Sequence, residues 1–236
     1  MARAVLVPGF TQTATTWNPV VAALRASGVD AIALDVPPAL DFVSTAAALG
    51  TAGGRGAYVG YSMGGRLCLR LALDHPELVD ALALVSASPG IADPIERDTR
   101  RASDEALARD VEDRGVEPFL RDWLAQPMFA TLGESSAQIR ERAGAQTAAD
   151  LAAALRRLGT GTQEPLWSRL AELQMPVALV TGRADTKFER INDEMEAACT
   201  GVASLERVHL DAGHALPLEQ PEALASFLVG WLAALG

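Results

Sequence analysis

Short apolar runs recur along the chain with lengths typical of buried β-strands. Most are continuously apolar rather than alternating, as expected of strands covered on both faces. The predicted strands are Arg3 to Val7, Asp30 to Leu34, Gly56 to Gly60, Ala81 to Ser86, Pro176 to Thr181 and Ala203 to Leu210. Segments long enough for helices separate most of them, for example Thr16 to Ser27, Ser62 to Asp74, Phe188 to Thr200 and Pro221 to Leu235. This alternation predicts an α/β fold with a mainly parallel, doubly wound sheet of about six strands.

One long stretch breaks this alternation. Between about Ile91 and Leu170 the sequence is charged and Ala-rich, with helical patterning and no convincing strand. Pro89-Gly90 marks its start directly after a predicted strand, and Met175-Pro176 marks the return to the sheet. We expect one structural domain with an α/β core (residues 1–90 and 171–236) and an inserted helical cap (residues 91–170). The insertion leaves from the carboxyl end of a strand, where open α/β sheets bind ligands.

The composition of the 236 residues fits a globular protein with a sizeable core. Hydrophobic residues make up 49% and charged residues 21%, which argues against disordered, collagen-like and disulfide-scaffold classes. A formal charge of -10 disfavours nucleic acid and anionic membranes as partners. No apolar run approaches the ~18 residues of a membrane span. The N-terminal residues are typical of a strand rather than a signal peptide, so we expect a cytoplasmic protein.

The chain has two cysteines, Cys68 and Cys199. They form no C-x-x-C pair and stand near no cluster of histidines, so the sequence predicts neither a zinc site nor a redox dithiol, and no metal or other cofactor. We expect both cysteines to be small buried side chains. The oligomeric state is left open by the sequence.

The clearest chemical motif is Gly60-Tyr61-Ser62-Met63-Gly64, a G-x-S-x-G pattern. It follows an apolar strand and opens a predicted helix, the context that a nucleophilic serine on a sharp strand-to-helix turn requires. The glycines fit because the neighbours of a strained tight turn have no room for a Cβ. We therefore predict that Ser62 is the reactive serine; a plain strand-to-helix turn is the alternative.

A reactive serine needs a base, and the chain has three histidines. His75 falls at the end of the helix after the motif, about 18 Å from Ser62 at ~1.5 Å per residue, so we expect it at the surface or as a helix cap. His209 lies within a predicted strand and is expected to be packed or at a sheet edge. His214 follows that strand on a Gly-containing loop from which it can face Ser62, and it is the predicted base.

The third residue should be a carboxylate that orients the imidazole, and with this motif the chain order is serine, acid, histidine. Asp185 fits this order. It follows the predicted strand Pro176 to Thr181 through Gly182-Arg183-Ala184 and so emerges at the carboxyl end of the sheet. Asp211 is the competitor, but it stands only three residues before His214 and is better placed to cap a turn.

An oxyanion hole is expected beside the serine. With this motif one amide comes from the residue after the serine, Met63, and another from the loop after the first strand. That loop is Pro8-Gly9-Phe10. Gly9 allows close backbone approach, and Phe10 is the natural second donor because Pro8 has no N–H. A simple turn that ends the strand is the alternative.

Four pieces of sequence together resemble the α/β-hydrolase fold, and the resemblance spans the whole chain. They are Val7 to Phe10, Gly60 to Arg66, Gly182 to Asp185, and Gly213-His214. Within that superfamily the chain is most similar to the 2-succinyl-6-hydroxy-2,4-cyclohexadiene-1-carboxylate synthases of menaquinone biosynthesis, lyases that eliminate pyruvate. More telling than the triad are further pieces: Ser88 to Gly90, Arg97 to Arg100, Asp122-Trp123, Gln126 to Phe129, Gly161 to Gln163, Leu166-Trp167 and Asp185 to Phe188.

The resemblance implies a catalytic triad of Ser62, Asp185 and His214. It also implies a substrate pocket lined by four side chains: Tyr61, Arg66, Arg100 and Trp123. Arg142 is a weaker candidate, since matching it needs a one-residue gap. Guanidinium groups suit a small substrate that bears carboxylates. The alternative for Arg100 is an ordinary solvated position, because it stands in a run of charged residues.

Three features differ from the usual pattern of that family. Pro8 stands where the family usually has His before Gly-Phe, and Asp35 to Leu40 replaces a segment resembling Asp-Leu-Pro-Gly-His-Gly. The chain begins at what would be the third strand of an eight-stranded fold, so we expect a sheet without the N-terminal antiparallel hairpin.

Two chemistries are open to a serine triad on this fold. In a lyase, Ser62 activated by His214 removes a proton; in a carboxylesterase, Ser62 forms an acyl-enzyme. A non-catalytic binding protein on the same fold is a third hypothesis, because fold alone does not decide function.

Overall fold

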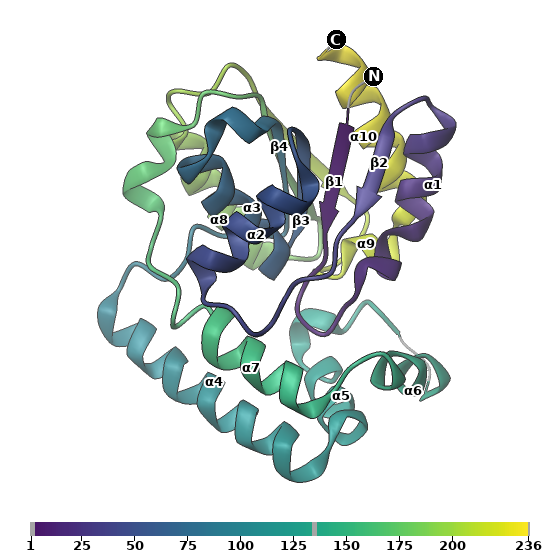
Figure 1. Ribbon diagram of the computed structural model, residues 1–236, viewed down its shortest axis with the longest axis vertical. Helices are drawn as coiled ribbons and strands as arrows, with labels where there is room; N and C mark the ends of the chain where they lie inside the picture. The colour runs from purple at the N-terminus through teal and green to yellow at the C-terminus, as the bar shows by residue number, and fades with distance from the viewer. Residues whose placement is uncertain (1–2, 134–135, 236) are drawn as a thin grey trace.

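A parallel six-stranded sheet forms the centre of the molecule (Figure 1). The structure is a computed structural model that describes residues 3–133 and 136–235. The strands run in the order β2-β1-β3-β4-β5-β6, and each neighbouring pair is parallel. Their bounds are β1 (Arg3–Val7), β2 (Asp30–Ala33), β3 (Gly56–Tyr61), β4 (Val79–Val85), β5 (Val177–Gly182) and β6 (Leu205–Leu210). The predicted parallel sheet of about six strands is confirmed.

Helices cover both faces of the sheet. The helices of this α/β layer are α1 (Asn18–Ala26), α2 (Phe42–Gly53), α3 (Met63–Asp74), α8 (Thr186–Ala198), α9 (Leu216–Glu219) and α10 (Pro221–Ala234). One face carries α1 and α10, and the opposite face carries α2, α3 and α8 (Figure 1). In β1, Val5 and Val7 belong to the core under α2 and α3, whereas Ala4 and Leu6 belong to the core under α1 and α10. Each strand thus contributes side chains to the cores on both faces of the sheet, which explains why the strand sequences are continuously apolar.

Position in the sheet explains how the strand sequences differ. β3 lies between β1 and β4, and all of its residues are buried. β6 lies at one edge, where a half-buried strand accommodates charged residues such as Glu206 and Arg207. His209 lies in this edge strand, and its Nδ1 is 3.0 Å from Glu189 Oε1 on α8. The expectation of a packed or edge histidine is confirmed.

The helix α2 was not among the helical segments named from the sequence. Its residues are small and apolar around most of the helix, so no amphipathic stripe marks it. The helix begins at a cap, because the Asp41 carboxylate accepts a hydrogen bond from the Ser44 amide at 2.9 Å. Burial of Phe42, Ala46 and Leu49 then fixes it on the sheet.

Between β4 and β5 the chain forms a separate helical layer. It contains α4 (Pro94–Arg114), α5 (Val116–Leu124), α6 (Ser136–Gly144) and α7 (Ala148–Leu158). Short 3-10 helices are η1 (Ala14–Trp17), η2 (Pro76–Leu78), η3 (Pro127–Phe129) and η4 (Trp167–Glu172), the last two also in this segment. The layer lies beyond the ends to which the strand arrows point (Figure 1). It has its own small core, which includes Val111, Phe119 and Leu155.

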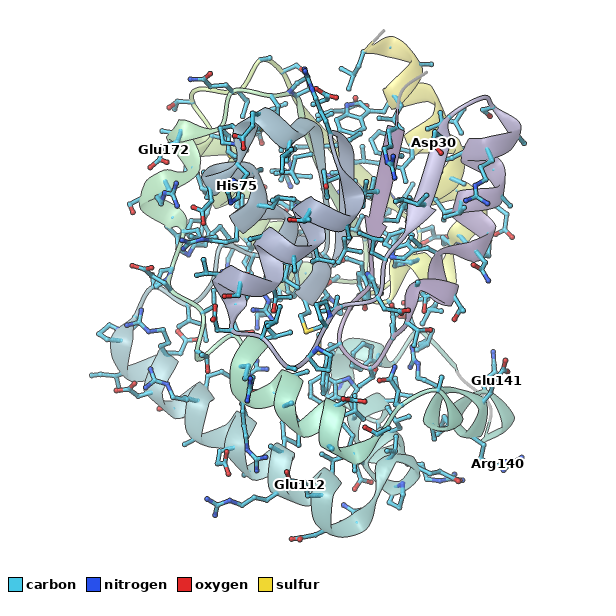
Figure 2. All side chains as sticks on the ribbon, viewed as in Figure 1. Asp30, His75, Glu112, Arg140, Glu141 and Glu172 are labelled. Atoms are coloured by element: carbon cyan, nitrogen blue, oxygen red, sulfur yellow. The ribbon has the colours of Figure 1, made fainter. Side chains whose placement is uncertain are left out.

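The outer side of the helical layer is polar. Glu112, Arg140 and Glu141 are exposed and project away from the α/β layer (Figure 2). In the described parts of the chain, no helix is long and apolar enough to cross a membrane. Cys68 and Cys199 are free thiols, and both are buried, as expected.

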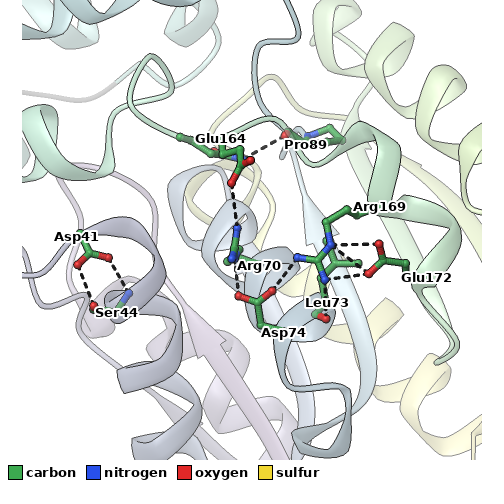
Figure 3. Close-up of polar contacts among 10 residues, drawn as sticks. Asp41, Ser44, Arg70, Leu73, Asp74, Pro89, Glu164, Arg169 and Glu172 are labelled. Atoms are coloured by element: carbon green, nitrogen blue, oxygen red, sulfur yellow. Dashed lines mark hydrogen bonds and ion pairs between the residues drawn. The ribbon is translucent and has the colours of Figure 1, made fainter.

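Arg169 ties the segment that returns from the helical layer to the C-terminal end of α3 (Figure 3). Its Nη1 donates to Asp74 Oδ1 at 2.7 Å, and its Nη2 donates to the Leu73 carbonyl at 3.0 Å. The same guanidinium bonds Glu172, and Arg70 donates to the second Asp74 oxygen. Burial raises the pKa of Asp74, but hydrogen bonds from Arg169 and Arg70 outweigh it and hold that pKa below its ordinary value.

We expect Asp74→Asn to destabilise the protein by about 1 to 2 kcal/mol at neutral pH, because two guanidinium groups then face a neutral partner. The folded-state pKa of Asp74 is depressed, so its contribution is present above the unfolded-state pKa and is lost as the pH falls through the folded-state pKa. The difference in melting temperature between wild type and variant should therefore shrink from about pH 6 to about pH 3.

Asp80→Asn is the control for this measurement. Asp80 pairs with Arg55, and both side chains are largely exposed, so the pair should contribute less than ~1 kcal/mol. Equal losses in the two variants at neutral pH would contradict a stabilising role for the Asp74 contacts.

Candidate active site

Ser62 occupies a strained turn between β3 and α3. Its backbone has φ 49° and ψ -110°, a conformation that costs a non-glycine residue about 1 to 3 kcal/mol. Its amide donates to the Val85 carbonyl at 2.9 Å, and its carbonyl accepts from the Arg66 amide at 3.1 Å. In the described residues, the other non-glycine residues with positive φ are Thr11 and Ser86, which follow β1 and β4. Backbone strain therefore gathers at the carboxyl edge of the sheet.

Two glycines of the motif allow backbone contacts that a side chain would block. A Cβ at Gly60 would lie 2.5 Å from the Gly65 Cα. A Cβ at Gly64 would lie 2.3 Å from the Val7 carbonyl oxygen and 2.5 Å from the Pro8 carbonyl oxygen. Gly60 thus lets α3 pass close to β3, and Gly64 lets α3 approach the loop after β1.

We expect Gly64→Ala to lower the free energy of unfolding by about 2 kcal/mol or more, because the added methyl group meets the backbone of Val7 and Pro8. Urea denaturation monitored by circular dichroism measures the change. Gly230→Ala in α10 is the control, since a Cβ there meets no atom within 4 Å. That variant should be neutral or gain up to ~1 kcal/mol. Similar stabilities for the two variants would contradict the close approach at Gly64.

His214 and Asp185 complete a hydrogen-bonded chain with Ser62. The His214 Nε2 lies 3.2 Å from Ser62 Oγ, and the His214 Nδ1 lies 2.7 Å from Asp185 Oδ2. His214 is 1% exposed and Asp185 is 8% exposed. Asp185 follows β5 and His214 follows β6, so the two side chains meet at the carboxyl ends of adjacent strands, and His214 reaches Ser62 from there. Asp211, the competing carboxylate, lies exposed at the surface.

Aromatic rings enclose the imidazole of His214. The ring centroids of Tyr61, Phe129 and Phe188 lie 5.5, 5.8 and 4.7 Å from that of the imidazole. Exclusion of water strengthens the hydrogen bonds of a buried polar chain. His75 lies at the end of α3, partly exposed and on the part of the α/β layer away from the helical layer (Figure 2).

A cleft opens beside Ser62. The enclosed space next to Ser62 is small, and the rest of the cleft is open to solvent. The loops after β1 and β6 and the helical layer all contribute to its walls. The lining residues are Phe10, Thr11, Gln12, Tyr61, Ser62, Trp123, Leu124, Met128, Phe129, Leu132, Arg142, His214 and Ala215.

Phe10 and Met63 are the predicted oxyanion-hole residues. Phe10 lines the cleft, and Met63 follows Ser62 as the first residue of α3. Within the described part of the chain, neither backbone amide donates a hydrogen bond to another protein group. The Gln12 amide closes the turn after β1 by donating to the Gly9 carbonyl at 3.2 Å. Both amides are therefore available to an oxygen atom of a ligand.

The structure separates the predicted substrate-binding residues into two groups. Tyr61 and Trp123 line the cleft, and so does Arg142, the weaker candidate. Arg66 and Arg100 are not among the described residues that line it. The ring of Tyr61 contacts the imidazole of His214. Trp123 packs against Phe129 and with it forms part of the cleft wall that the helical layer provides.

Arg66 and Arg100 bind protein groups instead. The guanidinium of Arg66 is buried and donates to Gln163 Oε1 at 2.7 Å and to the Leu158 carbonyl at 2.8 Å. Burial lowers the pKa of Arg66, and the positive charge of Arg100 lowers it further. Arg100 donates from Nε to the buried Asp104 at 2.8 Å. Their predicted contact with a substrate carboxylate remains a prediction.

The sequence did not single out several side chains that surround Ser62 and His214. Thr11 and Gln12 follow the predicted oxyanion loop, and Phe129 and Phe188 contact the imidazole. The two phenylalanines lie within segments that carried the family resemblance, which was their only sequence signal. No group of three or more His, Cys, Asp or Glu residues able to hold a metal ion occurs among the described residues.

Comparison with known proteins assigns the family. Residues 4–227 match the alpha/beta hydrolase family. The chain belongs to this family. A 2-succinyl-6-hydroxy-2,4-cyclohexadiene-1-carboxylate synthase from Klebsiella pneumoniae is 31% identical over 180 residues, which are 75% of this chain and 68% of the relative. A putative synthase of the same name from Bacillus subtilis is 35% identical over 181 residues, 75% of this chain and 65% of the relative.

A solved structure extends the likeness of this α/β hydrolase over the full fold. MenH from S. aureus has a TM-score of 0.89 and 26% sequence identity, with 99% of this chain and 94% of that chain covered. The predicted α/β-hydrolase fold and the resemblance to these synthases are confirmed. The protein is an α/β hydrolase, and its fold is similar to that of MenH.

Proposed function

We propose that this α/β hydrolase is a 2-succinyl-6-hydroxy-2,4-cyclohexadiene-1-carboxylate synthase that forms its product by eliminating pyruvate. The observation that carries the proposal is the hydrogen-bonded chain Ser62–His214–Asp185 beside a cleft that also contains Arg142. Such a chain supplies a base, and a guanidinium group suits a substrate that bears carboxylates. The names of the relatives from Klebsiella pneumoniae and Bacillus subtilis support the same assignment.

The proposed reaction begins with proton transfer. Ser62 Oγ passes its proton to His214 Nε2 while it removes a proton from a ring carbon of the substrate. The electron pair of that C–H bond shifts into the ring and leaves it with one more double bond, while the C–O bond to the enolpyruvyl group breaks. The released enolpyruvate takes the proton from His214 and becomes pyruvate, so Ser62 and His214 end in their starting states.

Charge develops at two places during this step. The imidazolium of His214 is stabilised by the Asp185 carboxylate at 2.7 Å. Negative charge on the substrate gathers on the carbonyl oxygen next to the carbon that loses its proton. The amides of Phe10 and Met63 are the proposed donors to that oxygen.

Arginine side chains are the proposed partners of the substrate carboxylates. Arg142 already lines the cleft. For Arg66 to bind a carboxylate, its guanidinium would have to exchange the bonds to Gln163 and Leu158 for bonds to the substrate. We assign the first contact to Arg142 because it lines the cleft, whereas Arg66 is not among the described residues that line it.

The decisive experiment offers the purified protein two substrates in parallel: the enolpyruvyl precursor of the named product and a p-nitrophenyl ester of a short acid. We expect pyruvate release from the first, followed with lactate dehydrogenase and NADH, and little p-nitrophenol from the second. Ester cleavage without pyruvate release would identify a carboxylesterase instead. If the protein released neither pyruvate nor p-nitrophenol, it would be neither the proposed synthase nor a carboxylesterase for these substrates.

A further inference from the structure

The loop that carries His214 is held by a carboxylate outside the triad. Glu219, at the end of the short helix α9, accepts a hydrogen bond at Oε2 from the Gly213 amide at 2.8 Å. Its Oε1 accepts a second hydrogen bond from the Ala215 amide at 3.1 Å. One carboxylate thus binds the amides on both sides of His214. The two oxygens of an ionised carboxylate are suited to this, since both are acceptors.

The backbone of the same turn reinforces these contacts. The Glu219 amide donates to the Ala215 carbonyl at 3.0 Å, so Ala215 binds both the main chain and the side chain of Glu219. Pro217 lies inside this turn and has no N–H to compete for the carboxylate. α9 lies at the lower end of the α/β layer in Figure 1, on the side of the helical layer.

The other side of the loop is fixed to the segment that carries Asp185. The Ala184 amide donates to the Ala212 carbonyl at 3.0 Å. A Cβ at Gly182 would lie 2.2 Å from the same carbonyl oxygen, so the two loops approach as closely as backbone allows. The backbone of His214 is therefore held by Ala184 on one side and by Glu219 on the other.

We propose that Glu219 is a positioning residue for the catalytic imidazole. The proposal rests on the proposed role of His214 as the base. The His214–Ser62 distance of 3.2 Å is set by the loop backbone, because the imidazole is anchored at Asp185 and any shift of the loop rotates the ring about that contact. Hydrogen bonds to an ionised acceptor are stronger than those between neutral groups, so Glu219 restrains the loop more than a neutral side chain would. Such a restraint keeps Nε2 within reach of Ser62 Oγ before substrate binds.

The test compares Glu219→Gln with Glu222→Gln. Glu219→Gln keeps the size of the side chain but turns one acceptor oxygen into an NH₂ donor that faces a backbone amide. Glu222 is the control because it is an exposed glutamate in the first turn of α10. We expect Glu219→Gln to lower kcat by about 10- to 100-fold, since a displacement of ~1 Å costs on that order, with KM changed less than about twofold. Glu222→Gln should match wild type in both constants.

A second measurement needs no substrate. Proton NMR detects the deshielded Nδ1 proton that His214 shares with Asp185, and we expect Glu219→Gln to shift or broaden this signal while Glu222→Gln leaves it unchanged. Glu219→Asp keeps the charge but is one methylene shorter, so it should also fail to span both amides and should disturb the signal. Melting temperatures of all variants report on loop stability separately.

The outcomes separate this role from the proposed function. A lower melting temperature in Glu219→Gln, with wild-type kcat and an unchanged Nδ1 signal, would mean that Glu219 only stabilises the loop, and the proposal would be overturned. If the wild-type protein released no pyruvate, the proposed function would fail, but the Nδ1 signal would still decide whether Glu219 positions His214.

Discussion

Replacing Ser62 by alanine is expected to reduce pyruvate release by about 10³- to 10⁶-fold, because the loss of a triad member removes most of the chemistry of such a site. The fold should persist. Among the described residues, the Ser62 hydroxyl makes one hydrogen bond, to His214 at 3.2 Å, whereas the backbone bonds that hold the turn do not involve the side chain. Steady-state kinetics and circular dichroism on the same preparation measure the two effects.

The strained backbone makes this prediction stringent. Alanine at φ 49° carries the same strain as serine, so the variant should melt within a few degrees of wild type. If turnover of the enolpyruvyl precursor stayed near the wild-type rate, Ser62 would not be the reactive serine and the triad assignment would be wrong.

His214→Ala is expected to cause the second-largest loss, about 10³-fold or more in kcat. Without the imidazole, Ser62 has no group within hydrogen-bond distance, among the residues that the structure describes, to take its proton. Because His214 is buried, the variant leaves a small cavity at the cleft, and free imidazole added to the assay should restore part of the turnover. Rescue by imidazole would distinguish a missing base from a general loss of structure.

The other two histidines provide matched controls. His209 contacts Glu189 on the edge strand, and His75 caps the end of α3 near the surface. His209→Ala and His75→Ala should each change kcat by less than about threefold, as surface substitutions usually do. A folded His209→Ala protein that lost as much turnover as His214→Ala would show that the base had been assigned to the wrong strand end.

The hydrogen-bonded residues at the site could be predicted from sequence because each stands within four residues of the end of a strand. Ser62, Asp185 and His214 follow β3, β5 and β6, and parallel strands bring their carboxyl ends to one edge of the sheet. The position of each residue along the chain therefore places it at this edge of the sheet. The same argument excluded His75, which stands at the far end of a helix.

The long side chains around the cleft could not be predicted in this way. Arg66 starts one helical turn from Ser62, but its flexible stem reaches Gln163 on a segment almost a hundred residues later. Arg100 finds a closer partner in Asp104, one turn along its own helix. Which partner a guanidinium group binds depends on acceptors brought near it by distant parts of the chain, and no local pattern contains that information.

The sequence by itself determined the strand-and-helix alternation, the parallel sheet, the turn at Ser62 and the residues that reach it, because these depend on short-range patterns and on the direction of parallel strands. The tertiary structure alone decided how the helical layer packs over the sheet. The docking of this layer brings Phe129 to the imidazole of His214 and Arg142 to the cleft. The same layer supplies the Leu158 carbonyl that binds the guanidinium of Arg66. Glu219 likewise acquires its role only when α9 folds back on the loop of His214. Those contacts are set by packing between segments far apart in the chain, where geometry rather than local propensity selects the partner.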